Sequence, residues 1–410
     1  MGESATIAIN KRCTELRKTG RKIYRLGLGQ SPFPVPESVT QALQENAHQK
    51  DYLPVKGLPA LRSAITEYYR RTQGLKYSSD NVLVGPGTKE LMFLMQLTYY
   101  GDLVIPSPSW VSYAPQARII GRNLHWLPTD IETGLGVTPE ALESMCEHDP
   151  GLPRLLILNY PGNPTGMTYT DHQLEAIADI ARRYRVLLLA DEIYCGLTFN
   201  GKHTSIARYY PEGTIISNGL SKWCGAGGWR FGAFVFPDSL IWLLDAMAAV
   251  ASETFTSTSA PIQFAAISAF STNPELERYL VKCRTILKEL CHYAWQQLVD
   301  AGAEVTEPKG GFYLFPNFDP LRDRLIKKGA CDGEQFCKLL LEETGIACLP
   351  GKVFGRQNSE FSTRVACVDF DGGRALAAIS NDTIIDKLFL RSYCTPVVEA
   401  IDLLCDFVTT

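Results

Sequence analysis

The chain has 410 residues, of which 45% are hydrophobic and 20% charged, so its composition is that of a globular protein with about two domains or one enlarged domain. Forty Lys and Arg residues against 44 Asp and Glu residues give a net charge of −4. This near-balance argues against a general nucleic-acid binder or a polybasic membrane binder, but it leaves room for a small anionic ligand in one local pocket.

The cysteines and the start of the chain bear on the compartment. None of the twelve cysteines forms a Cys-x-x-Cys pair with another, which argues against a zinc ribbon or a thioredoxin-like motif. The first twenty residues hold no apolar stretch typical of a secretory signal. The longest apolar-rich segment, 240–252, is interrupted by Asp245 and is too short to span a bilayer. We therefore expect a cytoplasmic protein with reduced thiols and no metal site.

Residues 81–236 alternate short apolar segments with amphipathic ones. The spacing predicts helices at 88–99 and 171–185. Strands are predicted at 81–84, 102–105, 124–127, 155–158, 186–190, 214–217 and 231–236. Strands that are apolar along their whole length and separated by helices are typical of a mostly parallel sheet covered on both faces. This part of the chain therefore predicts an α/β domain.

The pattern differs on either side of this segment. Residues 1–40 hold a short helix and a Pro-rich loop, and long helices are predicted at 238–252, 261–271 and 274–300. Strands predicted at 303–306, 311–315 and 364–369 then mix with helices around 333–344 and 383–408. We expect a large domain at 41–290 and a small α+β domain at 291–410, which the N-terminal arm, 1–40, joins.

A glycine-rich turn follows the first predicted strand and leads into a helix. Gly85 and Gly87 precede Thr88 and Lys89, and the free N–H groups and positive dipole end of the helix favour an anion there. The glycine spacing is neither that of a P-loop nor that of a dinucleotide fingerprint, and such a turn can also be purely structural.

Two polar residues follow later strands of the predicted sheet. Asn163 lies in a rigid Asn-Pro-Thr-Gly turn after the strand at 155–158, and Asp191 follows the strand at 186–190. Ligands of open α/β sheets bind at the carboxyl ends of the strands, where both residues are expected. The alternatives are a structural turn for Asn163 and a helix N-cap for Asp191.

Lys222 and Arg230 are the two cations of a Gly-rich stretch at 217–232. A lone lysine is usually a solvated surface residue, but Lys222 is followed by Trp223 and Cys224. Burial in such surroundings would lower the pKa of the amine and make it a usable nucleophile.

Taken in order, these motifs resemble those of the class I/II aminotransferases of pyridoxal-phosphate fold type I. The order is the Gly-rich turn, Asn-Pro-x-Gly, Asp-x-x-Tyr, Ser-Lys and Gly-x-Arg-x-Gly, and the resemblance covers essentially the whole chain. Residues 4–17 resemble the start of the prokaryote-type aspartate and prephenate aminotransferases. The resemblance implies an α/β fold with a large domain, whose mostly parallel central sheet is flanked by helices, and a smaller α+β domain. It also implies pyridoxal 5′-phosphate as cofactor, an amino acid and a 2-oxo acid as substrates, and a homodimer with shared active sites.

The resemblance gives roles to residues around the cofactor ring. Lys222 would bind the cofactor covalently and act as general base and acid, and Asp191 would pair with the protonated ring nitrogen. Tyr194 and Asn163 would hydrogen-bond the ring oxygen. Trp110 would stack on the ring, although it could also be an ordinary buried tryptophan.

The resemblance places further residues at the phosphate and at the substrate. The phosphate ligands would be Arg230, the backbone amides of Gly87, Thr88 and Lys89 and, from the neighbouring subunit, Tyr52. The substrate would be bound by Arg364, which clamps the α-carboxylate, together with Asn163, Gly29, Thr6 and Lys89. Thr6 and Lys89 match the pair that recognises the distal carboxylate in the prokaryote-type subgroup. Two departures are visible: Gly219 stands where many relatives have a phosphate-binding serine, and Gly29 is followed by Gln30 and Ser31 in place of Glu and Pro.

These observations predict a ping-pong aminotransferase that moves the amino group of aspartate to 2-oxoglutarate, with prephenate as a further candidate acceptor. The alternative is an enzyme for aromatic or other amino acids. The unusual loop around Gln30 favours it, and so do Trp110 and Tyr113. A fold-type-I lyase would share nearly every residue named, because the cofactor supplies the difficult chemistry.

Overall fold

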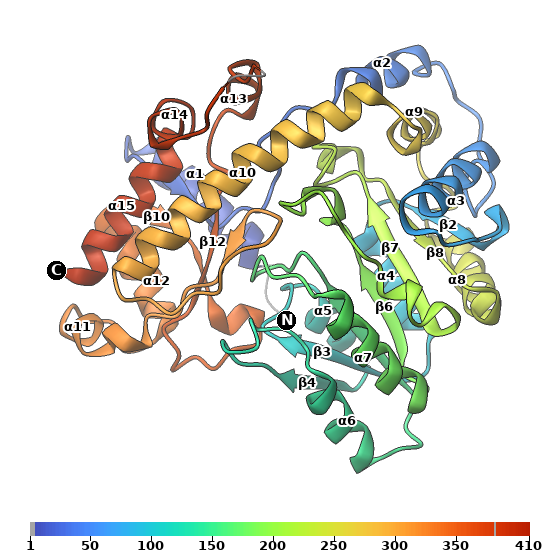
Figure 1. Cartoon of the computed structure of the whole chain (residues 1–410), viewed down its shortest axis with the longest axis horizontal. Helices are drawn as coiled ribbons and strands as arrows, with labels where there is room; N and C mark the ends of the chain where they lie inside the picture. Colours follow the sequence, from blue (N-terminus) through green and yellow to red (C-terminus); the bar gives the residue numbers. More distant parts are fainter. Residues whose placement is uncertain (1–4, 381–382) are drawn as a thin grey trace.

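The computed structural model describes residues 5–380 and 383–410, with side chains from residue 7 onward. Figure 1 shows a large sheet with helices packed on it and, beside it, a second group of helices and short strands built mainly from the C-terminal residues. In the part of the chain that the structure describes, no helix is long and apolar enough to cross a membrane.

The large sheet has seven strands in the order β2-β8-β7-β6-β5-β3-β4. All neighbouring strands are parallel except at β8, which is antiparallel to both β2 and β7. The strands are β2 (Val82–Gly85), β3 (Asp102–Ser107), β4 (Leu124–Pro128), β5 (Arg154–Asn159), β6 (Leu187–Asp191), β7 (Thr214–Gly219) and β8 (Gly232–Val235). The prediction of a mostly parallel sheet is confirmed, and all seven predicted strands are present.

Both faces of this sheet are buried, as its uniformly apolar strands require. The helices of this part of the chain are α2 (Glu37–Glu45), α3 (Pro59–Gln73), α4 (Thr88–Thr98), α5 (Tyr113–Ile119), α6 (Pro139–His148), α7 (Asp171–Arg183), α8 (Ile241–Thr254) and α9 (Ala260–Phe270). On β5, Leu155 and Ile157 pack into one hydrophobic cluster, with helices α4, α5 and α8, while Leu156 and Leu158 pack into another, with α6 and α7.

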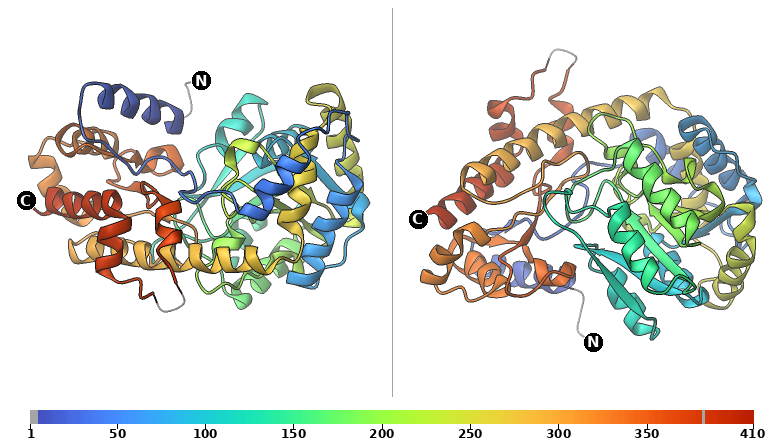
Figure 2. Two further views of the ribbon diagram at one scale, coloured as in Figure 1. Left: turned by 90° about the horizontal axis from the view of Figure 1, so that it is seen from above. Right: turned by 60° about the horizontal axis from the view of Figure 1, so that its bottom comes forward.

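The second group of elements contains two small sheets. One pairs β1 (Tyr24–Arg25) in parallel with β10 (Ile346–Ala347), and the other is antiparallel in the order β11 (Leu349–Pro350), β12 (Thr363–Ala366), β9 (Tyr313–Leu314). The helices are α1 (Ala5–Lys18), α10 (Pro274–Asp300), α11 (Arg322–Lys327), α12 (Gly333–Thr344), α13 (Gly372–Ala377), α14 (Lys387–Tyr393) and α15 (Thr395–Thr409). Figure 2 shows the N-terminal helix α1 beside these C-terminal elements, where Cys13 packs against Leu341 and Ala347.

Two details of the predicted secondary structure are wrong. Residues 303–306 do not form a strand: Glu304 makes only an isolated bridge to Asn317. A ladder cannot extend far beyond it, because Pro308 has no N–H to donate. The helix expected at 383–408 is two helices, α14 and α15, since Pro396 lacks the N–H that a continuous helix would bond to the Ser392 carbonyl.

The division into an arm, a large domain and a small domain stays a prediction. The boundary at residue 290 falls inside α10, which runs without a break from Pro274 to Asp300. The arm shares a sheet with the C-terminal part through β1 and β10, as expected for a segment that joins the small domain.

Candidate functional site

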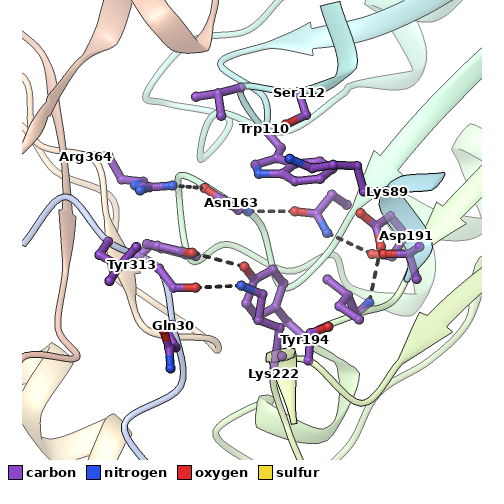
Figure 3. A pocket seen from close by; sticks show the side chains of 18 of the residues that line it. Gln30, Lys89, Trp110, Ser112, Asn163, Asp191, Tyr194, Lys222, Tyr313 and Arg364 are labelled. Atoms are coloured by element: carbon purple, nitrogen blue, oxygen red, sulfur yellow. Dashed lines mark hydrogen bonds between the residues drawn. The ribbon is translucent and has the colours of Figure 1, made fainter. Parts of the chain in front are cut away.

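A cavity of about 460 Å³ lies where the carboxyl end of the large sheet meets the small sheets. Strands β3, β5, β6 and β7 point the same way, so the segments that follow them converge on this cavity. Figure 3 shows the side chains that line it. Those the sequence singled out are Gly29, Thr88, Lys89, Trp110, Asn163, Asp191, Tyr194, Lys222, Arg230 and Arg364.

Lys222 follows β7, and its amine points into the cavity. Its Nζ donates a hydrogen bond to the Gly29 carbonyl oxygen over 2.6 Å, which links the large sheet to the N-terminal arm (Figure 3). Burial lowers the pKa of the amine, and the nearby Arg364 guanidinium lowers it further, while Tyr313 and Asp191 oppose the shift. A lysine with a lowered pKa holds its proton less tightly, which suits an amine that must act as a nucleophile and as a base.

Asp191 ends β6 and is only 3% exposed. The Tyr113 hydroxyl donates to its Oδ2 over 2.5 Å, and the Ile193 N–H donates to its Oδ1 over 3.4 Å. Burial raises the pKa of this carboxyl to about 6, although both hydrogen bonds act in the opposite direction. A buried carboxylate of this kind calls for a cationic partner, and the cavity it lines is where such a partner would bind.

Asn163 and Arg364 meet across the cavity from different parts of the chain. The Arg364 Nη1 donates to the Asn163 Oδ1 over 3.0 Å (Figure 3), and its Nη2 donates to the Gly27 carbonyl over 2.7 Å. The arginine is 2% exposed, and its buried Nε has no hydrogen-bond partner among the residues that the structure describes. A buried guanidinium with an unused donor beside a cavity fits an incoming carboxylate.

The opposite end of the cavity is cationic. Arg230 lies against the turn before α4: its Nη2 donates to the Pro86 carbonyl over 3.3 Å, and a Cβ added to Gly87 would lie 2.2 Å from the same nitrogen. Helix α4 begins at Thr88, so its first N–H groups and positive dipole end add to the charge of Arg230. The Lys89 amine lies 5.1 Å from the centre of the Trp110 ring. This end of the cavity therefore suits a phosphate or another anion.

Two of the described sequence-predicted residues do not line the cavity, and the side chain of a third lies outside the described residues. Gly87 shapes it indirectly through its close approach to Arg230. Tyr52 is 90% exposed and lies on the surface of this chain. Thr6 belongs to α1, but its side chain lies outside the described residues; its neighbour Ile7 does line the cavity.

Sequence reasoning missed the functional placement of two tyrosines. The sequence indicates Tyr113 only as a feature that favours an aromatic donor, whereas its hydroxyl binds Asp191. Tyr313 was part of a predicted strand and lies in the cavity, with its hydroxyl 3.1 Å from that of Tyr194. The only signal for Tyr113 was its place three residues after Trp110 at the end of a strand, and the sequence held no signal for Tyr313.

Comparisons with known proteins find a matching family, similar sequences and similar structures. The family "aminotransferase class I and II" matches residues 21–371. An aspartate aminotransferase of Geobacillus stearothermophilus is 34% identical over 365 residues, which are 86% of this chain and 89% of that protein. An asparagine–oxo-acid transaminase of Streptococcus mutans is 31% identical over 366 residues, 87% and 90% of the two chains. The solved structure of Thermus thermophilus aspartate aminotransferase with maleate has a TM-score of 0.84 at 28% identity and covers 99% of this chain and 97% of its own.

The chain therefore belongs to the aminotransferase class I and II family, whose members depend on pyridoxal phosphate. It is an aminotransferase, which sets aside the lyase alternative. The residues at the cavity fit the cofactor: a buried carboxylate, Asp191, suits a protonated ring nitrogen, Lys222 offers an amine, and Arg230 with the start of α4 suits the phosphate.

The turn at Gly87 leads to a first prediction. Gly87 has a φ of +94°, and an alanine Cβ there would lie 2.2 Å from the Arg230 Nη2. We expect Gly87→Ala to weaken cofactor binding by about 10–100-fold, because the side chain displaces Arg230 and strains the start of α4. Gly74→Ala is the matched control, since Gly74 also has a positive φ, +71°, but faces open space. Absorbance titration of the apo variants with cofactor measures both, and equal dissociation constants for the two variants would contradict the prediction.

Proposed function

We propose that this aminotransferase uses aspartate as amino donor and 2-oxoglutarate as acceptor. The observation that carries the proposal is the Lys89 amine at the cationic end of the cavity. Partial burial lowers the pKa of Lys89, and so do the two neighbouring cations, Arg230 and Lys222. Lys89 also stands at the start of α4, where a positive charge opposes the helix dipole. An arrangement with so much positive charge favours a ligand with more than one anionic group, and an amino-dicarboxylate bound beside a cofactor phosphate supplies them.

The comparisons support a dicarboxylic substrate. The relatives that match most of the chain include aspartate aminotransferases, and the similar Thermus thermophilus structure holds maleate, itself a four-carbon dicarboxylate. In the proposed complex Arg364 binds the α-carboxylate and Lys89, with Thr6, binds the distal one. Arg364 suits this role because its planar guanidinium can grip a carboxylate with two parallel hydrogen bonds.

The proposal gives the remaining residues of the cavity distinct tasks. Asp191 pairs with the ring nitrogen, Tyr194 and Asn163 bind the ring oxygen, and Trp110 stacks on the ring. Arg230 and the backbone amides of Gly87, Thr88 and Lys89 hold the phosphate. When bound, pyridoxal phosphate supplies an electron-withdrawing ring that stabilises negative charge on the substrate's α-carbon.

Lys222 is proposed to bind the cofactor covalently and then to move the proton. Its amine is held by the carbonyl of Gly29, and this contact keeps Nζ inside the cavity, beside Tyr194 and Phe312, whose ring centres lie 5.7 Å and 5.9 Å away. A primary amine with a lowered pKa can take a proton from a carbon acid and return it to a neighbouring atom. The surrounding aromatic rings limit the access of water to that proton.

We also propose that the chain works as a cytoplasmic homodimer. Tyr52 supports this proposal, because a tyrosine with 90% of its surface exposed is available to a second copy. In that arrangement Tyr52 reaches the phosphate in the partner's cavity, so each active site needs both chains.

An enzyme for aromatic or other apolar amino acids is the second candidate. The observation that favours it is the wall of the cavity formed by Ile7, Leu28, Val111 and Trp110, which offers apolar surface to a donor side chain.

The donor is tested by comparing wild type with Lys89→Met for aspartate and for phenylalanine. We expect kcat/KM for aspartate to fall by about 10–100-fold, because a charge-assisted hydrogen bond is lost, and kcat/KM for phenylalanine to change by less than about 3-fold. Single-turnover rates followed by the absorbance of the cofactor measure both donors.

The matched control is Lys338→Met, which removes the same charge from an exposed site on α12, where Lys338 lies 4.0 Å from Glu342. It should leave both donors unchanged. Equal losses for aspartate and phenylalanine in Lys89→Met would remove the distal-carboxylate role. A wild type that prefers phenylalanine would favour the second candidate.

A further inference from the structure

Tyr313 is a cavity residue to which the proposed function gives no task. It lies on β9, is 1% exposed, and comes from the small antiparallel sheet that also carries Arg364 on β12. Figure 3 shows it between Arg364 and Tyr194, facing the loop that holds Gly29. A buried tyrosine in this position joins the element that carries Arg364 to the elements that carry Lys222 and Tyr194.

Both ends of the Tyr313 side chain make specific contacts. Its hydroxyl oxygen is 3.1 Å from the Tyr194 hydroxyl oxygen, and the Arg364 guanidinium lies 4.6 Å from the centre of its ring. A Cβ on Gly29 would lie 1.8 Å from the Tyr313 hydroxyl oxygen, so the hydroxyl fits closely against the backbone whose carbonyl binds Lys222. A residue with another shape or without a side-chain donor would lose at least one of these contacts.

We propose that Tyr313 is a positioning residue of the active site: its hydroxyl donates to Tyr194 and strengthens the donation of Tyr194 to the cofactor, and its ring supports the Arg364 guanidinium. This inference rests on the proposed roles of Tyr194 and Arg364.

The chemistry of the two phenols explains the direction of the effect. Burial raises the pKa of Tyr194 well above its usual range, so this phenol keeps its proton and can donate it. A hydroxyl has one proton but can also accept, so when Tyr194 donates into the cavity its oxygen can accept from Tyr313. Hydrogen bonds arranged in such a chain polarise and strengthen each other.

The charged groups that face this pair come from several elements. Lys222 follows β7, Asp191 ends β6, Arg364 lies on β12 and Arg230 precedes β8. Asp191 and Arg364 act on the Tyr194 phenol and on the Lys222 amine, and Arg230 acts on the amine. None of these four residues is replaced in a Tyr313→Phe variant. The variant therefore isolates the contribution of one hydroxyl.

The test is a pH titration of the absorbance of the bound cofactor, with no substrate added. Donation by Tyr194 stabilises negative charge on the ring oxygen, and this matters most after the lysine-bound cofactor has lost its proton. Weaker donation therefore raises the pKa of the lysine-bound cofactor that the absorbance titration measures, by about 0.3–1 unit for Tyr313→Phe. We expect kcat to fall by about 3–10-fold and KM for the amino acid to change by less than about 2-fold.

A second variant, Tyr313→Leu, also removes the ring beneath Arg364. We expect it to raise KM for the amino acid by about 3–30-fold on top of the spectral shift, because the cation–π contact is lost. The matched control is Tyr160→Phe: Tyr160 is equally buried, and its hydroxyl accepts from the Ile206 N–H over 2.8 Å, away from the cavity lining. Melting temperatures of the apo variants show whether each one folds.

The outcomes separate this inference from the proposed function. If Tyr313→Phe has the same titration curve as wild type while that of Tyr194→Phe is shifted, the role of Tyr313 alone is overturned. If Tyr194→Phe also has the wild-type curve, the proposed contact of Tyr194 with the cofactor is removed. Because no donor is present, neither result depends on whether aspartate is the substrate.

Discussion

Replacing Lys222 with alanine is expected to lower turnover by at least about 10⁴-fold, because one side chain is proposed both to bind the cofactor covalently and to move the proton. The Lys222 Nζ is held in the cavity by the Gly29 carbonyl over 2.6 Å, and burial lowers its pKa. After the substitution neither the covalent bond to the cofactor nor the positioned base remains. A water molecule cannot replace both.

Lys222→Arg is the informative companion of Lys222→Ala. It keeps a positive charge in the cavity, but a guanidinium does not lose its proton in proteins and cannot serve as nucleophile or base. We therefore expect both variants to lose the absorbance of covalently bound cofactor and to be equally inactive in single-turnover assays with aspartate. If Lys222→Ala kept that absorbance while Lys89→Met lost it, Lys89 would be the attachment point and the proposed assignment would be wrong.

The placement of the cavity was predictable because parallel strands set one edge for all of their following loops. Asn163 and Asp191 each stand just after an apolar run, and Lys222 follows another such run closely. Once these runs form neighbouring parallel strands, as β5, β6 and β7 do, the three residues must converge. Local sequence was sufficient here because uninterrupted apolar runs mark strands that are buried on both faces.

The contacts between the two halves of the site could not be predicted in the same way. Arg364 binds the Gly27 carbonyl, 337 positions away, and Lys222 binds the Gly29 carbonyl, 193 positions away. Such pairs depend on how the small sheets dock on the large one, and neither local periodicity nor turn chemistry encodes that docking. The role of Tyr313 could not be predicted for the same reason, because it depends on contacts with Tyr194, Arg364 and Gly29, which come from distant segments of the chain.

The second large effect is expected at Asp191. Asp191→Asn removes the negative charge that is proposed to keep the cofactor's ring nitrogen protonated, and we expect turnover to fall by about 10²–10⁴-fold with the cofactor still attached to Lys222. The amide has nearly the same shape, and the Tyr113 hydroxyl can still donate to it, as it donates to the Asp191 carboxylate in the wild type. Single-turnover rates with aspartate measure the loss. A decrease smaller than about 10-fold would show that the charge is not needed.

The pH dependence of this carboxyl distinguishes a catalytic defect from a folding defect. Burial raises the pKa of Asp191 to about 6 in the folded apo protein, above its value in an unfolded chain, so the group destabilises the fold increasingly as the pH rises from about 4 through 6. The apo Asp191→Asn variant should therefore be more stable than wild type at pH 8, by roughly 1–3 kcal/mol, and should lose that advantage near pH 4. Tyr113→Phe should be less stable than wild type at pH 8, because it removes a hydrogen bond that favours the charged carboxylate and so raises the pKa of Asp191 further. As the pH is lowered, cofactor binding should therefore weaken at a higher pH in this variant than in wild type. Urea unfolding of the apo proteins at pH 4 and pH 8 measures their stabilities. Absorbance titrations with cofactor measure how binding depends on pH. If apo Asp191→Asn is less stable than wild type at pH 8, the charged carboxylate stabilises the apo fold, and the prediction that it is an unpaired charge available to the cofactor is wrong.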